Sequence, residues 1–269
     1  TRKLAELMVG RDIDLSPRRS RGEAKETLLS LSNVGLTKDG VDRIAQVSFN
    51  VRAGEIVGVA GVSGNGQREL AEIVAGLISP TSGEVSINGE RVNGVGTRNV
   101  RKAGLAYVPE DRLGTGLAPS LSIVDNLVLT RDRGFLVDRK SAHFEAEAFI
   151  KQLEIKTPNA LTATRKLSGG NSQKVLLARE IFAAGNNSRV LVVCSPTRGL
   201  DVGAVEAVHK LLDEARSAGK AILLISEDLD EVLTLADKIL VLYRGSVVHE
   251  AVGDKVDVEA VGLAMAGLS

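Results

Sequence analysis

The first third of the chain carries the apolar patterns that are typical of β-strands. Four segments are predicted strands: 28–34, 44–51, 84–87 and 105–108. Asn88-Gly89 is a hairpin signal after the third strand, and Pro109 ends the fourth. A segment at 55–60, apolar after Glu55, enters a glycine-rich turn, after which 68–74 has helical spacing. The pattern therefore predicts short strands around one strand–turn–helix unit.

Helical spacing of apolar residues governs the middle of the chain. The helices predicted there are 122–129, 139–153 and, after Gly170, 172–183. Because strand patterns stop before this stretch and return after it, we expect residues from about 113 to 172 to form an inserted helical subdomain.

Fully apolar strands return in the last third of the chain. The elements predicted there are a strand at 190–193, a helix at 204–217 and a strand at 221–225. Such continuous runs suit parallel strands that are covered on both faces. An edge hairpin is predicted from 239–242 and 247–249 around Arg244-Gly245. The fold class is therefore α/β, with a mostly parallel sheet, an antiparallel β lobe and the inserted helical subdomain.

The ends of the chain have weaker patterns. Residues 1–10 have the pattern of the end of a short amphipathic helix, and 11–26 that of a charged, solvated linker. A basic run that contacts acidic lipid is the alternative for the linker, but four acidic residues dilute it. The chain begins at Thr1 without an initiator methionine, so we expect it to be a piece of a longer protein.

Composition excludes several classes of function. The 269 residues include 34 basic and 34 acidic side chains, and this zero net charge argues against binding to nucleic acid. Aromatic residues make up 3% of the chain, too few for base-stacking platforms. Cys194 is the sole cysteine, which excludes an intramolecular disulfide. No apolar run reaches the roughly 20 residues of a membrane-spanning helix, so membrane contact would need a partner.

The glycine-rich turn after 55–60 almost matches the phosphate loop G-x-x-x-x-G-K-[ST]. A working loop uses its lysine on the β- and γ-phosphates and its hydroxyl on Mg²⁺. Gln67 and Arg68 stand in those two places. The candidate phosphate-binding residues are Gly61, Ser63, Gly64, Asn65, Gly66, Gln67 and Arg68. A dinucleotide-binding turn is set aside, because the order of the glycines does not match G-x-G-x-x-G.

A second motif, Leu167-Ser168-Gly169-Gly170-Asn171, lies at a predicted helix start. Two glycines after a serine let a helix N-terminus approach a phosphate closely, with backbone N–H groups and the dipole directed at it. Taken alone, the motif could be a serine N-cap with incidental glycines. Together with the phosphate loop and Pro196-Thr197-Arg198-Gly199-Leu200-Asp201, however, it resembles the ATP-binding domains of ABC transporters over residues 28 to about 250.

The resemblance implies a P-loop NTPase-like core and a head-to-tail pair of domains, in which each serine-glycine motif completes the other domain's ATP site. For this chain's own loop it implies an Asp and a Glu after 190–193, where Cys194 and Ser195 stand. It implies a histidine after the next strand, where the chain has Ser226-Glu227-Asp228, and an adenine-stacking aromatic residue within 35–46, where there is none. Hydrolysis at this loop is therefore not expected, unless Arg68 acts as a replacement cation.

The partner-facing residues of the family pattern are retained. Ser168, Gly169 and Gly170 are intact, and Asp201 keeps the place of the bridging loop between two domains. Glu110 stands in the switch loop, where glutamine is usual, and is equally consistent with an exposed turn acid. The resemblance thus implies that the chain caps ATP on a partner domain, with Mg²⁺ at that partner's site and at most weak ATP binding at its own loop.

Three features resemble the second half of tandem ATPase subunits in carbohydrate importers: Asn171, the run 196–204 and Pro109-Glu110-Asp111-Arg112. The run 226–231 resembles the nucleoside-importing members. Residues 1–27 would then be the tail of a preceding domain and a linker, 28–250 the ATP-binding domain and 251–269 a C-terminal tail. The expected partners are an N-terminal ATP-binding domain in the same polypeptide, transmembrane permease subunits and a substrate-binding protein, at the cytoplasmic face of the plasma membrane. A scaffold that binds no nucleotide, or an ATPase that uses Arg68, are the alternatives.

Overall fold

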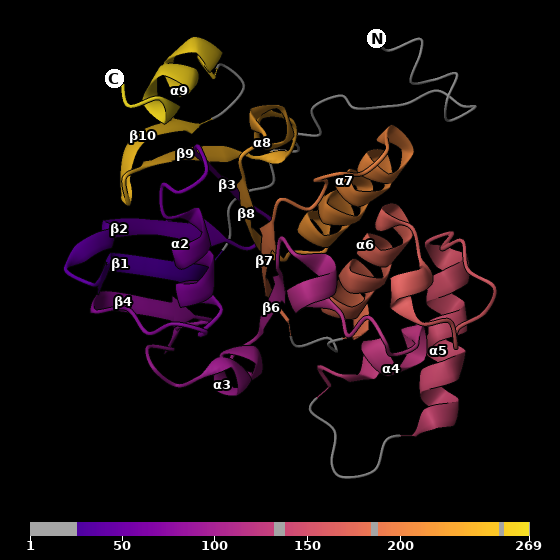
Figure 1. Cartoon of the computed structure of the whole chain (residues 1–269). Helices are drawn as coiled ribbons and strands as arrows, with labels where there is room; N and C mark the ends of the chain where they lie inside the picture. The colour runs from indigo at the N-terminus through magenta and orange to yellow at the C-terminus, as the bar shows by residue number, and fades with distance from the viewer. Residues whose placement is uncertain (1–25, 132–137, 184–187, 253–255, 269) are drawn as a thin grey trace. The chain divides into compact units, whose positions relative to one another are not determined.

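The structure is a computed structural model that describes residues 26–131, 138–183, 188–252 and 256–268 (Figure 1). The helix and linker predicted within 1–25 lie outside these residues. The chain divides into two compact units. One contains the described residues of Ser16–Tyr107, Asn187–Ser195 and Asp213–Ser269, and is called the sheet unit below. The other contains those of Val108–Asn186 and Pro196–Leu212, and is called the helical unit.

A four-stranded antiparallel sheet forms the first part of the sheet unit. Its strands, in sheet order, are β2 (Val41–Arg52), β1 (Thr27–Lys38), β4 (Ser82–Ile87) and β5 (Glu90–Arg91). The predicted strands are confirmed, and the first two are longer than predicted because the tight turn at Asp39-Gly40 lets pairing continue to Lys38 and Val41. The hairpin expected at Asn88-Gly89 is also confirmed, since Ile87 pairs with Glu90.

A six-stranded sheet is the centre of the same unit. Its strands, in sheet order, are β10 (Ser246–Val252), β9 (Lys238–Tyr243), β3 (Ile56–Ala60), β8 (Ala221–Ser226), β7 (Val190–Cys194) and β6 (Leu105–Val108). Strands β9, β3, β8 and β7 run parallel, and every residue of β3, β7 and β8 is buried. The antiparallel edge hairpin of β9 and β10 is confirmed. The continuous apolar runs thus form parallel strands that are covered on both faces, as predicted.

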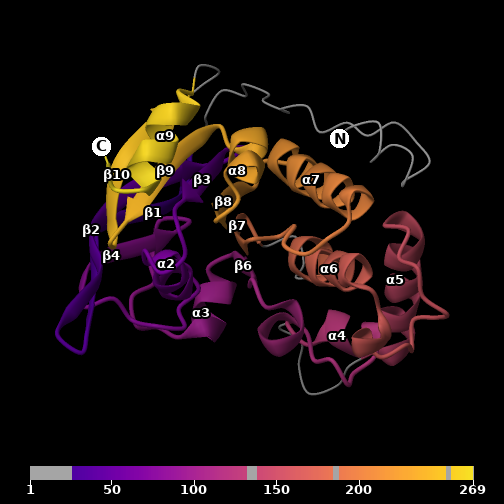
Figure 2. The same cartoon turned by 45° about the horizontal axis from the view of Figure 1, so that its top comes forward.

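Helices cover the sheets of this unit. They are α2 (Gln67–Val74), α3 (Thr97–Lys102), α8 (Leu229–Leu235) and α9 (Val258–Met265). Helix α8 packs so closely on β3 that a Cβ at Gly58 would lie 2.6 Å from Val232 Cγ1. Figures 1 and 2 both show α9 beside β9 and β10, where Val261 and Ala264 are buried against Val241. Only α2 was predicted, because α3 and α8 are shorter still and α9 is interrupted by Gly262, so none of the three displays a clear helical period.

The helical unit contains the helices predicted for the middle of the chain. They are α4 (Ile123–Val128), α5 (Arg139–Gln152), α6 (Gly169–Ala178) and the beginning of α7 (Val202–Ser217), with short turns η1 (Arg112–Gly116), η2 (Thr164–Lys166) and η3 (Arg179–Ala183). Helix α6 begins three residues earlier than predicted, since two glycines obscure its first turn, and its continuation η3 is a π-helix. The exact limits of the helical insertion and of the terminal tails remain predictions. Among the residues that the structure describes, no helix has the length and apolar character to cross a bilayer.

Leu70 on α2 tests the core of the sheet unit, because its side chain is fully buried in an apolar cluster with residues of both sheets. We expect Leu70→Ala to lower the free energy of unfolding by about 2–5 kcal/mol, the range for truncating a buried leucine. Chemical denaturation measures the change. Leu77→Ala is the control, since Leu77 is 52% exposed and its loss should change stability by less than about 0.5 kcal/mol. Equal effects of the two substitutions would contradict this assignment of the core.

Candidate functional site

The phosphate-loop segment connects β3 to α2, as its sequence predicted. Gly66 is the N-cap residue of α2 with φ 105°, a conformation that side chains rarely adopt. A Cβ at this position would also lie 2.7 Å from the carbonyl oxygen of Arg43 in β2. The curled backbone of a phosphate loop is therefore present, and Gly66 is required for it on two grounds.

The Gln67 side chain is folded into the curl that a phosphate would otherwise approach. It is 7% exposed, and its Nε2 donates a hydrogen bond to the Val62 carbonyl oxygen at 3.0 Å. The same Nε2 lies 2.6 Å from the position that a Cβ on Gly61 would take. The amide is neutral and turned inward, so it supplies no charge for β- and γ-phosphates.

Arg68 does not turn toward the loop. Its side chain is 84% exposed and its Nε pairs with Glu72 Oε1 at 2.8 Å, one turn along α2. This hydrogen bond to Glu72 also raises the pKa of Arg68. Glu69, in the first turn of α2, adds negative charge at the helix end that would otherwise favour a phosphate. Arg68 and Glu72 therefore interact with each other on the surface of α2, and neither of them is directed at the loop.

Asn65 ties the tip of the loop to the hairpin between β9 and β10. Its Oδ1 accepts a hydrogen bond from Arg244 N at 3.0 Å, and its carbonyl oxygen accepts one from Gly245 N at 2.8 Å. Ser63 and Gly64 are exposed beside it. The shape of the loop is therefore maintained by hydrogen bonds within the protein.

Strand β7 ends in Cys194 and Ser195, where the resemblance implied two carboxylates. Cys194 is buried, and it shares a hydrogen bond with the Tyr107 side chain. Burial raises the pKa of the Cys194 thiol to about 12, and burial likewise raises the pKa of Tyr107. Both groups are consequently neutral near pH 7. Neither can act as a general base or as an anionic metal ligand there.

The donors around this loop do not fit a magnesium-bound nucleotide, because Mg²⁺ prefers carboxylate and hydroxyl oxygens. Within 26–131, 138–183, 188–252 and 256–268, no three His, Cys, Asp or Glu side chains are grouped to hold a metal ion. After β8, Ser226 Oγ accepts a hydrogen bond from Asp228 N at 3.1 Å, and Asp228 caps α8. Glu227 is exposed. The stretch after β8 thus forms a helix cap.

The serine-glycine motif forms the first turn of α6 in the helical unit. Ser168 is the N-cap residue, and its Oγ accepts hydrogen bonds from Asn171 N at 3.4 Å and Asn171 Nδ2 at 2.9 Å. The Oδ1 of Asn171 accepts a hydrogen bond from Lys156 N at 2.9 Å. Ser168 therefore caps the helix. The first backbone N–H groups of α6 have no carbonyl partner within the helix and point outward from its start.

Gly170 is needed where α6 meets α7. A Cβ on Gly170 would lie 2.7 Å from the Cβ of Ala204, so any side chain would push the two helix starts apart. Asp201 Oδ1 accepts a hydrogen bond from Ala204 N at 3.0 Å and so fixes the first turn of α7. The motif and the predicted bridging loop are thus built against each other within one unit.

Two arginines extend this arrangement in a way that sequence reasoning missed. Arg112 donates to the Gly169 carbonyl oxygen at 3.3 Å and to the Arg198 carbonyl oxygen at 2.6 Å. The Arg198 side chain forms an ion pair with Glu110. Both arginines lie inside motifs that the sequence singled out, but nothing in the spacing of those motifs signals that they contact each other. Glu110 is partly exposed and paired, with no metal-ligand group around it among the described residues.

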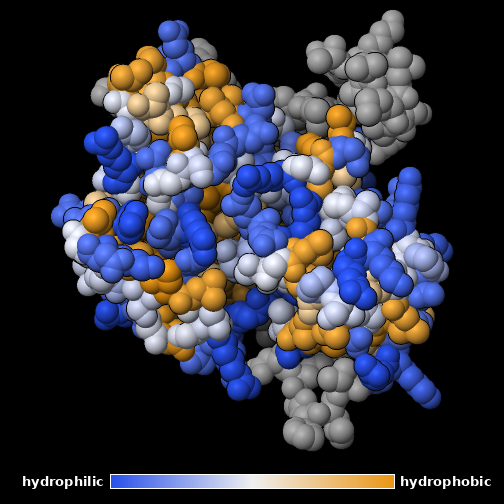
Figure 3. Space-filling model, viewed as in Figure 1, coloured by the Kyte–Doolittle hydropathy of each residue, from blue (hydrophilic) through white to orange (hydrophobic). Residues whose placement is uncertain are grey.

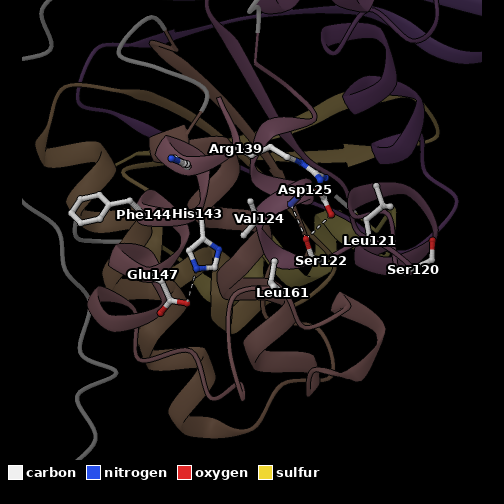
Figure 4. Close-up of a pocket in the computed structure, with 11 residues that line it drawn as sticks. Ser120, Leu121, Ser122, Val124, Asp125, Arg139, His143, Phe144, Glu147 and Leu161 are labelled. Carbon is white, nitrogen blue, oxygen red and sulfur yellow. Dashed lines mark hydrogen bonds and ion pairs between the residues drawn. The ribbon is translucent and has the colours of Figure 1, made fainter. Parts of the chain in front are cut away.

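An open pocket of about 770 Å³ lies elsewhere in the helical unit, between the start of α4, the helix α5 and Leu161 (Figure 4). Phe144 and Leu161 are exposed beside it, and Asp125 pairs with Arg139 at 2.9 Å across it. His143 and Glu147 lie on the same face of α5. A second apolar surface covers α9 of the sheet unit, where Figure 3 shows hydrophobic residues gathered. Its exposed members are Val258, Leu263 and Leu268.

Comparisons with known proteins agree with the observed fold. A family model described as "ABC transporter" matches residues 44–198. The solved structures similar to this chain include an ATP-binding subunit of an ABC transporter, with a TM-score of 0.75 and 22% identity over 89% of this chain and 100% of the other. A dimeric bacterial ABC transporter cassette superposes with a TM-score of 0.73 and 24% identity, over 85% of this chain and 100% of the other.

Curated relatives match almost the entire chain. A glucose import ATP-binding protein of Haloferax volcanii is 40% identical over 98% of this chain and 49% of its own length. A guanosine import ATP-binding protein of Bacillus subtilis is 36% identical over 98% and 53%. A ribose import ATP-binding protein of Rubrobacter xylanophilus is 40% identical, also over 98% and 53%. The chain therefore spans about half the length of the curated relatives it matches.

The thiol of Cys194 provides a direct test of the site at the end of β7. Its raised pKa keeps it protonated and buried, so we expect no alkylation by iodoacetamide at pH 8 in the folded chain and rapid alkylation in denaturant. Since the folded pKa of about 12 lies above the ordinary value of 9.0, stability from this group is complete below pH 9 and declines as the pH rises toward 12. Mass spectrometry measures the labelling. Rapid labelling of the folded chain at pH 8 would contradict the burial of this thiol.

Proposed function

The chain belongs to the ABC transporter family, and from this premise we propose that it is an ATP-binding domain that caps ATP held by a partner domain. The observation that carries the proposal is a contrast between its two nucleotide motifs. The Gln67 side chain turns into the phosphate loop and a neutral thiol stands at the end of β7, whereas Ser168, Gly169 and Gly170 form an intact helix start. One motif has lost the groups for hydrolysis, and the other keeps the groups that bind a phosphate.

The physical case for capping rests on α6. Its first backbone N–H groups have no acceptor within the helix, and its dipole places positive charge at the same end. Glycines at 169 and 170 keep side chains away from this end, so a phosphate carried by another domain can approach the backbone. This helix start therefore contributes to a site whose lysine, metal ligands and base come from the partner.

The partner in this proposal is a second ATP-binding domain that precedes this one in the same polypeptide. The relatives are about twice as long as this chain, and a similar cassette is dimeric, which supports a paired arrangement. Closure of the pair around ATP at the partner's loop, with Mg²⁺ there, would drive the transport cycle. This chain's own loop would bind ATP weakly.

The larger assembly is proposed from the relatives' names, which are those of glucose, guanosine and ribose import proteins. We infer that the subunit imports a sugar or a nucleoside, together with transmembrane permease subunits and a substrate-binding protein. It would act at the cytoplasmic face of the plasma membrane. The pocket beside Phe144 and Leu161, with apolar residues among ionic pairs, is a suitable contact for a permease segment.

An ATPase that uses Arg68 is not favoured, because the Arg68 side chain is paired with Glu72 on the outer surface of α2. A scaffold that binds no nucleotide explains the degenerate loop, and packing against Ala204 explains Gly170, but it gives no reason for Gly169, where a Cβ would meet nothing closer than 3.6 Å. Calorimetry with ATP on the paired domains separates that scaffold from a capping domain, since Ser168→Arg should weaken ATP binding only if this chain caps the nucleotide on the partner's loop.

Ser168→Arg in the full-length subunit with its permease tests the capping role. We expect ATP hydrolysis to fall to background, because a long cation at the N-cap occupies the space of the partner's phosphate. Ser168→Ala is a milder variant that loses the cap, worth about 1 kcal/mol of stability, and should retain partial activity. Ser217→Arg introduces the same residue at the exposed end of α7 and should leave activity unchanged. Full turnover in a folded Ser168→Arg subunit would refute the capping role.

Phosphate release by the isolated chain tests its own loop. With Mg²⁺ and ATP present, we expect no release above background, since loss of even one charge-stabilising group commonly lowers catalysis by about 100-fold or more. Arg68→Gln should leave this background unchanged. Robust release that Arg68→Gln abolishes would instead establish Arg68 as a replacement cation.

A further inference from the structure

The guanidinium of Arg112 joins two segments of the helical unit that are far apart in the sequence. Its Nη1 donates to the Gly169 carbonyl oxygen at 3.3 Å, and its Nη2 donates to the Arg198 carbonyl oxygen at 2.6 Å. Gly169 is the first residue of α6, and Arg198 lies three residues before Asp201. One side chain therefore fixes the start of the serine-glycine motif relative to the bridging loop.

The backbone turn that carries Arg112 is fixed by the neighbouring Asp111 side chain. Asp111 Oδ1 accepts hydrogen bonds from Leu113 N at 3.2 Å and Gly114 N at 2.8 Å, which fixes the turn that carries Arg112. In the opposite direction, the Arg198 side chain returns to Glu110. Two contacts thus join the segments around 110–112 and 198: the Arg112 side chain binds the Arg198 carbonyl oxygen, and the Arg198 side chain pairs with Glu110.

Helix stability does not explain this arrangement. A cation beside the first turn of a helix is opposed by the helix dipole. The ion pair of Arg198 and Glu110 joins side chains that are 65% and 43% exposed, and such exposed pairs contribute little to stability. What a guanidinium supplies here is geometry, because its rigid planar fork fixes two carbonyl groups in a defined relation.

We propose that Arg112 is a positioning residue that sets the orientation of Ser168, Gly169 and Gly170 toward the partner's ATP. This inference rests on the capping role proposed above. Without the two hydrogen bonds of Arg112, the first turn of α6 tilts relative to the bridging loop, and a smaller fraction of molecules presents its N–H groups in the binding geometry. The apparent affinity for ATP falls in proportion to the fraction of molecules that keep this geometry. The reacting groups lie on the partner domain, so the loss affects KM and leaves kcat unchanged.

Steady-state ATP hydrolysis by the full-length subunit with its permease tests this role through Arg112→Gln and Arg112→Lys. Both variants are expected to raise the KM for ATP about tenfold, the effect of losing a charged hydrogen bond, with kcat and the thermal midpoint close to those of the unaltered subunit. Lysine keeps the charge but its ammonium group lacks the fork that bridges two carbonyls. The matched control is Arg189→Gln, which makes the same chemical change at an exposed ion pair with Glu26 and should leave KM unchanged.

The results separate the possible roles of this side chain. A normal KM in Arg112→Lys beside a raised one in Arg112→Gln would overturn the proposal, since charge alone would then suffice. A normal KM in both variants, or a lost activity that simply follows a lowered thermal midpoint, would overturn it as well. Ser168→Arg is measured in parallel. If that variant is inactive while the Arg112 variants are normal, the positioning role alone fails; if it is fully active, the capping role fails.

Discussion

Burial of the parallel strands is the constraint on which the sheet unit depends. Strands β3, β7 and β8 are buried along their entire length, so polar chemistry has room only where they end. The turn after β3 still has a phosphate-loop shape, but β7 ends in a buried thiol and the turn after β8 caps a helix. The apolar strands are thus continuous, whereas the ends of β7 and β8 carry a buried thiol and a helix cap. Stability and chemistry are carried by different residues of the same strands.

The two nucleotide motifs also differ in how they are held. The phosphate loop is maintained by hydrogen bonds inside the sheet unit, from Asn65 to the β9–β10 hairpin and from Gln67 to Val62. The serine-glycine motif is maintained inside the helical unit, by Asn171, by the close approach of Gly170 to Ala204, and by Arg112. Each unit therefore supports its own motif, and a change in one motif need not disturb the other.

Much of the fold could be predicted from the sequence, because long strands and helices leave a clear period. The alternation of β1 and β2 and the apolar runs of β3, β7 and β8 follow from local patterns, whereas the start of α6 at Gly169 was missed because two glycines obscure its first turn. Helix α9 could not, since eight residues that include Gly262 display no clear helical period. The inward turn of Gln67 and the reach of Arg112 also could not, because the direction of a long side chain is decided by neighbours distant in the sequence.

Two glycines at the phosphate loop, Gly66 and Gly245, are required by packing, whether or not a nucleotide binds. A Cβ at Gly66 would lie 2.7 Å from the Arg43 carbonyl oxygen, and a Cβ at Gly245 would lie 2.5 Å from the same atom. A larger residue at Gly66 would push the phosphate loop away from β2, and one at Gly245 would push the β9–β10 turn away from the same strand. A glycine-rich loop in a protein of this family is consequently weak evidence of nucleotide turnover. The residue that follows the last glycine is the more informative one to inspect.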